Sequence, residues 1–182
     1  MITLAQQGTS LYTYINVDKY KTKGGQVNAS YSIYPQFTVK AGLAETGRYY
    51  LLNVSESKIA RFAYTTDVTS DLSYKIVKYG VNLSVFYKYT GRTPQFYVNS
   101  ANQVVEGFIS HFHTMDATAM KSFMRNRLNL SVGVNNIFNN KTIEAVAGAA
   151  GGSSHGGGSG TMNIGLGRTY FAKLSFVFNS YR

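Results

Sequence analysis

Hydrophobic and polar residues alternate one by one along most of the chain. In residues 26–33, the apolar side chains Val27, Ala29, Tyr31 and Ile33 are separated by Asn and Ser. The same period of two residues recurs in further segments, namely 37–44, 65–76, 81–90, 114–119, 128–135 and 170–178. Because successive side chains of a β-strand point to opposite faces, this pattern predicts strands with one apolar and one polar face. No segment shows a comparable period of 3.6 residues, and we assign no helix.

The connections between these strands alternate in length. The short ones are expected near residues 34–36, 77–79 and 124–126, and the long ones over about 45–60, 91–107 and 139–166. An up-and-down antiparallel sheet with tight turns at one edge and long connections at the other produces this order, whereas Greek-key crossings would disturb it. We count about seven full strands and a partial strand at residues 2–5. The pattern therefore predicts an all-β, up-and-down antiparallel sheet of seven to eight strands.

The alternation is compatible with two surroundings. A soluble barrel or sandwich buries its apolar face, whereas a transmembrane barrel turns that face to lipid and its polar face to water. Residues 21–33 and 64–76 form strands longer than the roughly 9–11 residues that cross a bilayer. Aromatic residues gather at the strand ends, as membrane barrels require at their two interfaces: Tyr12, Tyr14, Tyr20, Tyr49, Tyr50, Tyr87, Tyr89 and Tyr170. Together with the unequal connections, these features favour a transmembrane β-barrel segment.

The composition agrees with a β-rich chain. Its 182 residues include 15 Tyr, 11 Phe and 18 Gly but only 2 Pro, and aromatic residues favour strands. The absence of Cys excludes a disulfide scaffold and a zinc–thiolate site. No run reaches the roughly 18 apolar residues of a membrane helix, and residues 1–10 carry no secretory signal. If the protein acts outside the cytoplasm, the chain is therefore expected to be a mature form or a fragment.

The net charge of +10 predicts an anionic partner. The basic residues are spread singly, without the continuous patch or the module of a nucleic-acid binder, so we expect no nucleic-acid partner. The densest basic cluster is Lys19, Lys21 and Lys23, beside the edge with the long connections. These lysines are candidates for contact with lipopolysaccharide phosphates in the outer leaflet. A simple solvated strand end explains them equally well.

One histidine pair has the spacing of a candidate metal site. His111 and His113 lie two residues apart on one face, about 6.6 Å along a strand, and Met115 follows. Their parity is that of the outward row, and the further ligands that a metal needs are missing from the sequence. We therefore expect two histidines at the level of the lipid headgroups and no metal site.

The remaining charged residues do not suggest catalysis. Six occupy polar-face positions and are expected to line a lumen: Asp67, Asp71, Lys75, Lys88, Asp116 and Lys173. Asp67 and Asp71 resemble a carboxylate pair, but no substrate pocket is evident beside them. No G-x-S-x-G, H-E-x-x-H or phosphate-loop motif occurs. We expect neither an enzyme nor a cofactor.

Four stretches resemble strands of TonB-dependent outer-membrane receptors. NLSVGVNNIFNN (129–140) is similar to their penultimate strand, and GLGRTYFAKLSFVF (165–178) to the last strand, which ends on an aromatic residue. YINVDKYKTKGGQVNASY (14–31) resembles an earlier descending strand, and DATAMKSF (116–123) the strand before the penultimate one. The Gly/Ser-rich stretch 151–160 is similar to the loop that precedes the last strand in receptors of the Bacteroidetes kind.

This resemblance implies a 22-stranded barrel filled by an N-terminal plug. Such receptors import iron chelates, haem, cobalamin or glycans with energy from TonB, in the outer membrane. Residues 1–182 are then the C-terminal part of the barrel, without the plug, and their partners are lipid, lipopolysaccharide, the remaining barrel, TonB through the missing plug, and the barrel assembly machinery. Tyr170, Phe176 and Phe178 are the terminal-strand residues that this machinery reads, although here four residues follow Phe178.

Two functions from different classes remain at this stage. One is a nutrient-import receptor, and the other is a small soluble or surface β-domain that binds acidic or sugar ligands through its long loops. Insolubility without detergent would distinguish the first from the second. We further predict that strand 170–178 pairs with 128–138 and does not close a ring with 21–33. A barrel closed at eight strands fills its interior with side chains, where so many polar groups would lack partners.

Overall fold

The computed structural model describes residues 2–7, 11–16, 19–54, 57–98, 104–125, 127–146 and 160–178. These residues form thirteen strands and one short 3₁₀ turn. The strands, in chain order, are β1 Ile2–Gln7, β2 Leu11–Asn16, β3 Lys19–Tyr34, β4 Phe37–Val54, β5 Ser57–Ile76, β6 Val81–Thr90, β7 Thr93–Val98, β8 Val104–Ile109, β9 Phe112–Phe123, β10 Leu128–Asn135, β11 Thr142–Val146, β12 Gly160–Asn163 and β13 Thr169–Phe176. None of the described residues forms a helix long and apolar enough to cross a bilayer.

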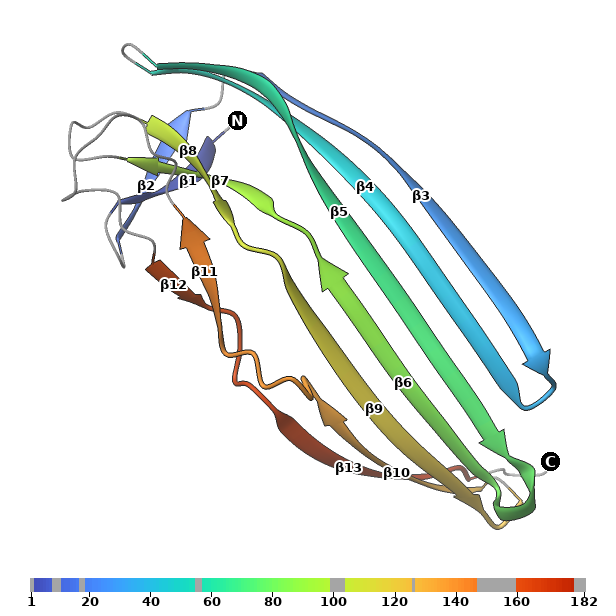
Figure 1. Ribbon diagram of the computed structural model, residues 1–182. Helices are drawn as coiled ribbons and strands as arrows, with labels where there is room; N and C mark the ends of the chain where they lie inside the picture. Colours follow the sequence, from blue (N-terminus) through green and yellow to red (C-terminus); the bar gives the residue numbers. More distant parts are fainter. Residues whose placement is uncertain are drawn as a thin grey trace.

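The larger sheet contains seven antiparallel strands in the order β13-β10-β9-β6-β5-β4-β3 (Figure 1). Its strands meander up and down, and β3, β4 and β5 reach 16, 18 and 20 residues. The predicted all-β, up-and-down sheet is therefore confirmed. Strands β13 and β3 lie at opposite edges, and β13 pairs with β10 from Leu128–Phe176 to Asn135–Thr169. The predicted partner of the last strand is thus confirmed, and no ring closes between these two edges.

The register gathers the apolar residues on one face of this sheet. One row across all seven strands contains Tyr31, Val39, Leu72, Val85, Ala117, Val134 and Tyr170. The neighbouring row on the other face contains Ser30, Lys40, Asp71, Phe86 and Asp116. We call these the apolar face and the polar face. Because a shift of one residue in any strand would reverse its two faces, the apolar pattern specifies the register.

Three tight connections join the strands at one end of the sheet. Pro35 and Gln36 form a turn, Val77–Tyr79 forms the 3₁₀ turn η1, and Met124 and Arg125 form a turn with φ of 51° and 53°. Gly80 ends η1 in the left-handed conformation, at φ 61°. The three predicted short connections are confirmed.

The predicted long connections lie at the other end of the sheet, and their described parts contain strands that the sequence pattern did not predict. Hairpin β4–β5 stays paired from Phe37–Tyr74 as far as Val54–Ser57, so residues 45–54 and 57–60 extend the sheet. The alternation of apolar and polar residues is weaker in this region, because the two faces of the hairpin no longer separate lipid from lumen. The backbone hydrogen bonds between the two strands nevertheless continue. The other two connections contribute β7 and β8, and β11 and β12.

These excursions form a second sheet, in the order β12-β11-β8-β7-β1-β2, at the end opposite the tight turns (Figure 1). Residues 2–5 were expected to start an eighth strand of the large sheet, but β1 pairs here with β2 and, in parallel, with β7. Among the described residues, the buried hydrophobic side chains all lie in this second sheet: Ala5, Phe96, Val104, Ile143 and Ala145. The seven-stranded sheet has no such core, so its apolar face needs another covering.

Candidate functional site

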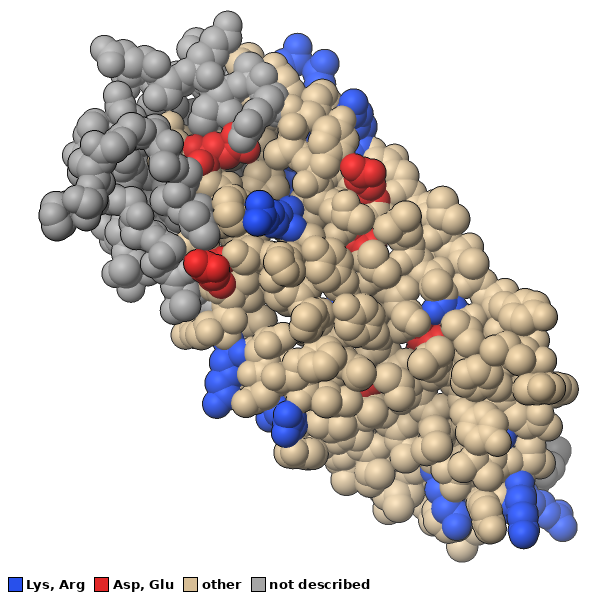
Figure 2. Space-filling view, viewed as in Figure 1, with Lys and Arg blue, Asp and Glu red and all other residues tan. Residues whose placement is uncertain are grey.

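The apolar face of the seven-stranded sheet is open along its length. Val27, Tyr31 and Leu174 expose 72%, 71% and 68% of their surface, and Tyr170 exposes 75%. Apolar surface left in water costs roughly 25 cal/mol per Å², and soluble proteins rarely leave a contiguous apolar surface of this extent uncovered. Figure 2 shows a broad tan surface along the sheet, with Lys and Arg mostly at its two ends and along its margin.

Charged residues are confined to the ends of the apolar face. At the outward positions of the described part of the seven-stranded sheet they are Lys19, Lys21, Lys23, Glu45, Lys58 and Lys121. Between them, β5 presents Val68, Ser70, Leu72, Tyr74 and Ile76. This uncharged stretch covers nine residues, which matches the roughly 9–11 residues of a membrane-crossing strand. The face therefore has the length and the polarity profile of a lipid-contacting surface.

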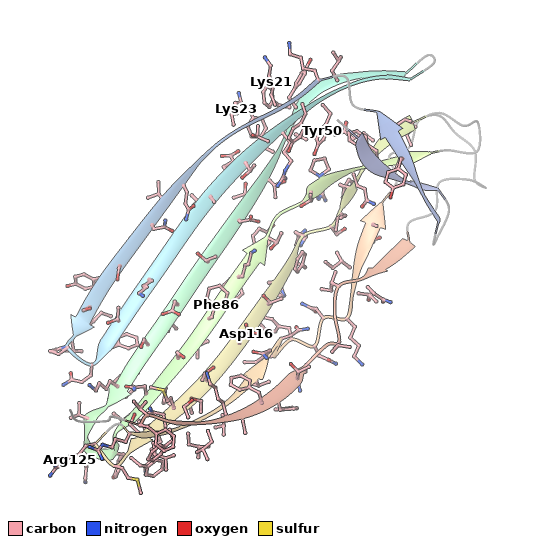
Figure 3. All side chains as sticks on the ribbon, turned by 180° about the vertical axis from the view of Figure 1, so that it is seen from behind. Lys21, Lys23, Tyr50, Phe86, Asp116 and Arg125 are labelled. Atoms are coloured by element: carbon pink, nitrogen blue, oxygen red, sulfur yellow. The ribbon has the colours of Figure 1, made fainter. Side chains whose placement is uncertain are left out.

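The polar face carries the six charged residues predicted for a lumen. Asp67, Asp71, Lys75, Lys88, Asp116 and Lys173 all occupy this face. Lys40 lies directly opposite Asp71 on the neighbouring strand, and Phe86 is the next residue along the same row. Asp116 lies beyond Phe86, and both are labelled at mid-sheet in Figure 3. Within the described residues, Asp67 Oδ1 is buried without a hydrogen-bond partner.

A shallow depression of about 320 Å³ lies in this region. Gly42 creates space in it, because a Cβ atom there would come within 2.6 Å of Asn28 Oδ1 and of Thr69 Oγ1. Ser30, Lys40, Asp71 and Phe86 also line it. The lining thus mixes hydroxyl, amide, amine and carboxylate groups with the apolar side chains of Ala29, Ala41 and Phe86. The sequence indicated the polar row but not the depression, because strand register brings Asn28, Gly42 and Thr69 side by side.

The second sheet packs against the polar face at the end with the long connections. The Thr65 hydroxyl donates a hydrogen bond to the carbonyl oxygen of Arg92 at 3.0 Å and accepts one from Arg48 Nη1 at 3.2 Å. Thr65 is buried, with 4% of its surface exposed. The Tyr50 ring contacts Tyr20 at 5.1 Å and Phe96 of the second sheet at 4.9 Å between centroids (Figure 3). These contacts hold the second sheet over the mouth of the polar face.

Sequence reasoning missed this anchor, because Thr65 fits an ordinary polar position of an alternating strand. Gly91 is a second part of it. Its backbone N–H donates to the Thr66 carbonyl oxygen at 2.8 Å, and a Cβ atom at Gly91 would lie 2.5 Å from that oxygen. The glycine directly after the alternating segment was the available signal for a close backbone approach.

The stretch NNIFNN that follows β10 forms an ordered corner. Asn136 and Asn139 adopt φ of 52° and 59°, a conformation that Asn tolerates better than most residues. Asn136 Nδ2 donates to the Asn140 carbonyl oxygen, and the Asn140 N–H donates back to Asn136 Oδ1. Asn139 Oδ1 accepts the backbone N–H of Arg168, which leads into β13. The corner thus joins the upper ends of β10 and β13.

The two candidate metal ligands lie among aromatic rings. His113 is opposite Tyr89 on the apolar face, and both His111 and His113 are exposed. His113 contacts Phe138 at 4.9 Å and His111 contacts Tyr89 at 5.8 Å between ring centroids. Within the described part of the chain, no three His, Cys, Asp or Glu side chains are grouped as a metal site would need. The predicted outward position of the pair agrees with this geometry.

The sequence profile of the Outer membrane protein beta-barrel family matches residues 1–153. This chain belongs to that family. The comparisons with curated proteins and with solved structures returned no match.

Family membership assigns the two faces of the barrel sheet. The protein lies in the outer membrane, so the apolar face contacts lipid and the polar face lines the interior. The small soluble domain that the sequence left open does not fit this location. At the end of the terminal strand, Phe178 exposes 86% of its surface and its ring lies 4.6 Å from that of Phe176. Tyr170 and these two rings face lipid, and their recognition by assembly machinery stays a prediction.

Proposed function

We propose that this chain is the C-terminal barrel portion of a TonB-dependent receptor that imports a scarce nutrient. The observation that carries the proposal is the open seven-stranded sheet with a charged polar face. Strands β3 and β13 are separated by five intervening strands, so closure requires further strands. A wide, water-filled barrel accommodates Lys40, Asp71 and Asp116 without the paired network that a filled interior would need.

The second sheet supports an uptake role over a simple open pore. It lies at the end with the long connections, which in outer-membrane barrels face the outside. Its anchor through Thr65 and Arg92 turns it toward the lumen side of the sheet. A second sheet that narrows the outer opening of the barrel would help to capture a ligand before transport. Iron chelates, haem, cobalamin and glycans are the substrate classes under this proposal, and TonB acts through a plug that other residues supply.

Transport, and not catalysis, is the activity proposed. The charged groups of the polar face are distributed over β4, β5, β6, β9 and β13 instead of converging on one reacting centre. Asp67 and Asp71 are four residues apart on one strand and so about 13 Å apart along it, too far for the carboxylate pairs of glycoside hydrolysis.

The test uses cells that produce the complete protein containing this chain. Uptake of labelled ferric chelate, haem, cobalamin and oligosaccharide would be measured in these cells, in a deletion strain, and in cells treated with a protonophore. We expect accumulation of one class to require both the protein and the proton-motive force, while surface binding survives the protonophore. Uptake that is insensitive to the protonophore would indicate a passive pore and contradict the proposal. The assembly role of Phe176 and Phe178 predicts in addition less barrel in the membrane when both are replaced by Ala.

A further inference from the structure

The apolar face of β3 ends in three lysines near the long connections. Lys19, Lys21 and Lys23 occupy alternate positions, so their side chains leave the same side of the strand. The register places Lys21 opposite Tyr49 and Lys23 opposite Gly47, both on the lipid-facing side. All three lysines are exposed. In Figure 3, Lys21 and Lys23 project away from β3 at its upper end.

The lysines lie just beyond the lipid-spanning stretch. Lys23 precedes Val27, the first residue of the apolar row on β3, by four residues, and Gly25 lies between them. Four strand residues span about 13 Å along the strand. Barrel strands tilt by roughly 35–45°, which reduces the rise to about 10 Å. Lys23 therefore lies at the level of the lipid headgroups, and Lys21 and Lys19 lie successively farther out along β3.

Aromatic rings lie beneath these lysines. Lys23 Nζ is 4.3 Å from the centroid of the Phe62 ring and 5.6 Å from that of Tyr64. The Phe62 ring in turn contacts Tyr49, at 5.2 Å between centroids. Gly47 makes room for Tyr64, because a Cβ atom at Gly47 would lie 2.7 Å from that ring. The amine of Lys23 is thus held beside two π faces on the lipid-facing side of the sheet.

The outward charge at this end is positive. In the described part of the seven-stranded sheet, Glu45, opposite Gly25, is the only carboxylate at an outward position, against Lys19, Lys21 and Lys23 of β3 and Lys58 of β5 at this end. An ammonium group carries three donors and no acceptor, so the cluster matches an anion with several oxygen acceptors. The apolar residues directly below it, from Val27 to Tyr31, match acyl chains. A ligand that has both an anionic group and acyl chains is a lipid, so the site fits an anionic lipid better than free phosphate.

We infer that Lys19, Lys21 and Lys23, supported by Tyr49, Phe62 and Tyr64, bind the phosphate groups of a phosphorylated glycolipid in the outer leaflet. The long connections identify this leaflet as the outer one. The inference depends on the membrane orientation and is independent of the transport proposal. The sequence supported two explanations of these lysines equally, namely lipopolysaccharide contact and a solvated strand end. The aromatic rings on the lipid-facing side favour the first, because a solvated strand end does not require them.

The experiment titrates the complete, detergent-extracted protein with bis-phosphorylated lipid A and counts bound lipid by native mass spectrometry. The K19Q/K21Q/K23Q variant is expected to bind at least tenfold more weakly, because each lysine near an anionic surface contributes roughly fivefold. The matched control is Lys121→Gln. Lys121 is also outward and lies over a ring, 5.1 Å from the Phe123 centroid, but at the end with the tight turns. Its variant should bind lipid A as the wild type does.

Two lipid controls identify what is recognised. Dephosphorylated lipid A should bind at least tenfold more weakly than the bis-phosphorylated form, and phosphatidylglycerol should not match the latter. Equal binding of the dephosphorylated lipid, or of the triple variant, would overturn the inference, and so would equal binding of phosphatidylglycerol. If the triple variant does not fold, as judged by heat-modifiable migration, Lys23→Gln alone is expected to lower the affinity about fivefold. An unchanged affinity of that single variant would equally overturn the inference.

Discussion

The carboxylate of Asp116 accepts a hydrogen bond from the backbone N–H of Asn136, with 2.7 Å between Oδ1 and N. Asp116 lies on the polar face of β9, and Asn136 is the first residue after β10. The pairing of β10 with β9 ends at Val134 and Ala117. The carboxylate therefore satisfies an N–H group where the strand ladder stops, and it directs the chain into the Asn-rich corner. One lumen-side charge is thus a structural support.

Replacing Asp116 by Ala should lower the free energy of unfolding by about 1–3 kcal/mol, because the Asn136 N–H loses its acceptor in a part-buried site. Asp116→Asn keeps an acceptor oxygen and should lose less. The measurement is a urea titration of the complete barrel in detergent, followed by heat-modifiable migration. Equal midpoints for the wild type and Asp116→Ala would contradict the role of this bond.

Gly133 should be intolerant of a side chain. A Cβ atom there would lie 2.5 Å from the Phe171 ring and 2.8 Å from the backbone oxygen of Ala117. The ring can move but the strand oxygen cannot, so Gly133→Ala is expected to cost about 1–3 kcal/mol.

The matched control is Gly25→Ala, because nothing lies within 4 Å of a Cβ atom at Gly25. That variant should be neutral or more stable by up to about 1 kcal/mol. The same urea titration compares the two, and equal costs would show that the β10–β13 contact at Gly133 is looser than described.

Leu72 and Ser73 are neighbours in β5 that should respond oppositely to a charge. Leu72 belongs to the apolar face and Ser73 to the polar face, where it lies opposite Thr38 and Ser84. Leu72→Lys places an amine in lipid and should cost about 2–4 kcal/mol, whereas Ser73→Lys meets water and should cost close to nothing. The folded fraction in lipid vesicles, at a series of urea concentrations, measures both. The reverse ranking would invert the assignment of the two faces.

The open edges can be tested by cross-linking, because the chain contains no cysteine. Val132 and Ala172 are opposite each other on β10 and β13, so the pair Val132→Cys and Ala172→Cys should form a disulfide on oxidation in the membrane. Ala29→Cys on β3, combined with Ala172→Cys, should form none. Mobility on denaturing gels, with and without reductant, distinguishes the results. A disulfide between β3 and β13 would mean that the ring closes within this chain.

The membrane strands could be predicted from the sequence because their pattern is local. Within each strand an apolar residue occupies nearly every second position, as around Val27, Tyr31, Leu72 and Leu174. The sequence of a single strand therefore indicates which of its faces avoids water. The turns were equally local, since Pro35 and Gly80 mark them within a few residues. The all-β fold, the outward parity of His113 and the lumen row that contains Asp116 follow from these two signals.

The tertiary structure decided what depends on distant partners. A long connection was expected over residues 45–60, yet β4 and β5 remain paired over 45–54 and 57–60 because each strand completes the hydrogen bonds of the other. Likewise, Ile2–Gln7 joins β7 in the second sheet, and Thr65 meets Arg92 across the mouth. The cation–π contact of Lys23 with Phe62 needs β4 between their strands to bring them together. The alternation of apolar and polar residues is a property of neighbouring residues and can be read from the sequence. Strand pairing and packing depend on which distant segments meet in space, and these contacts form only when the whole sheet folds.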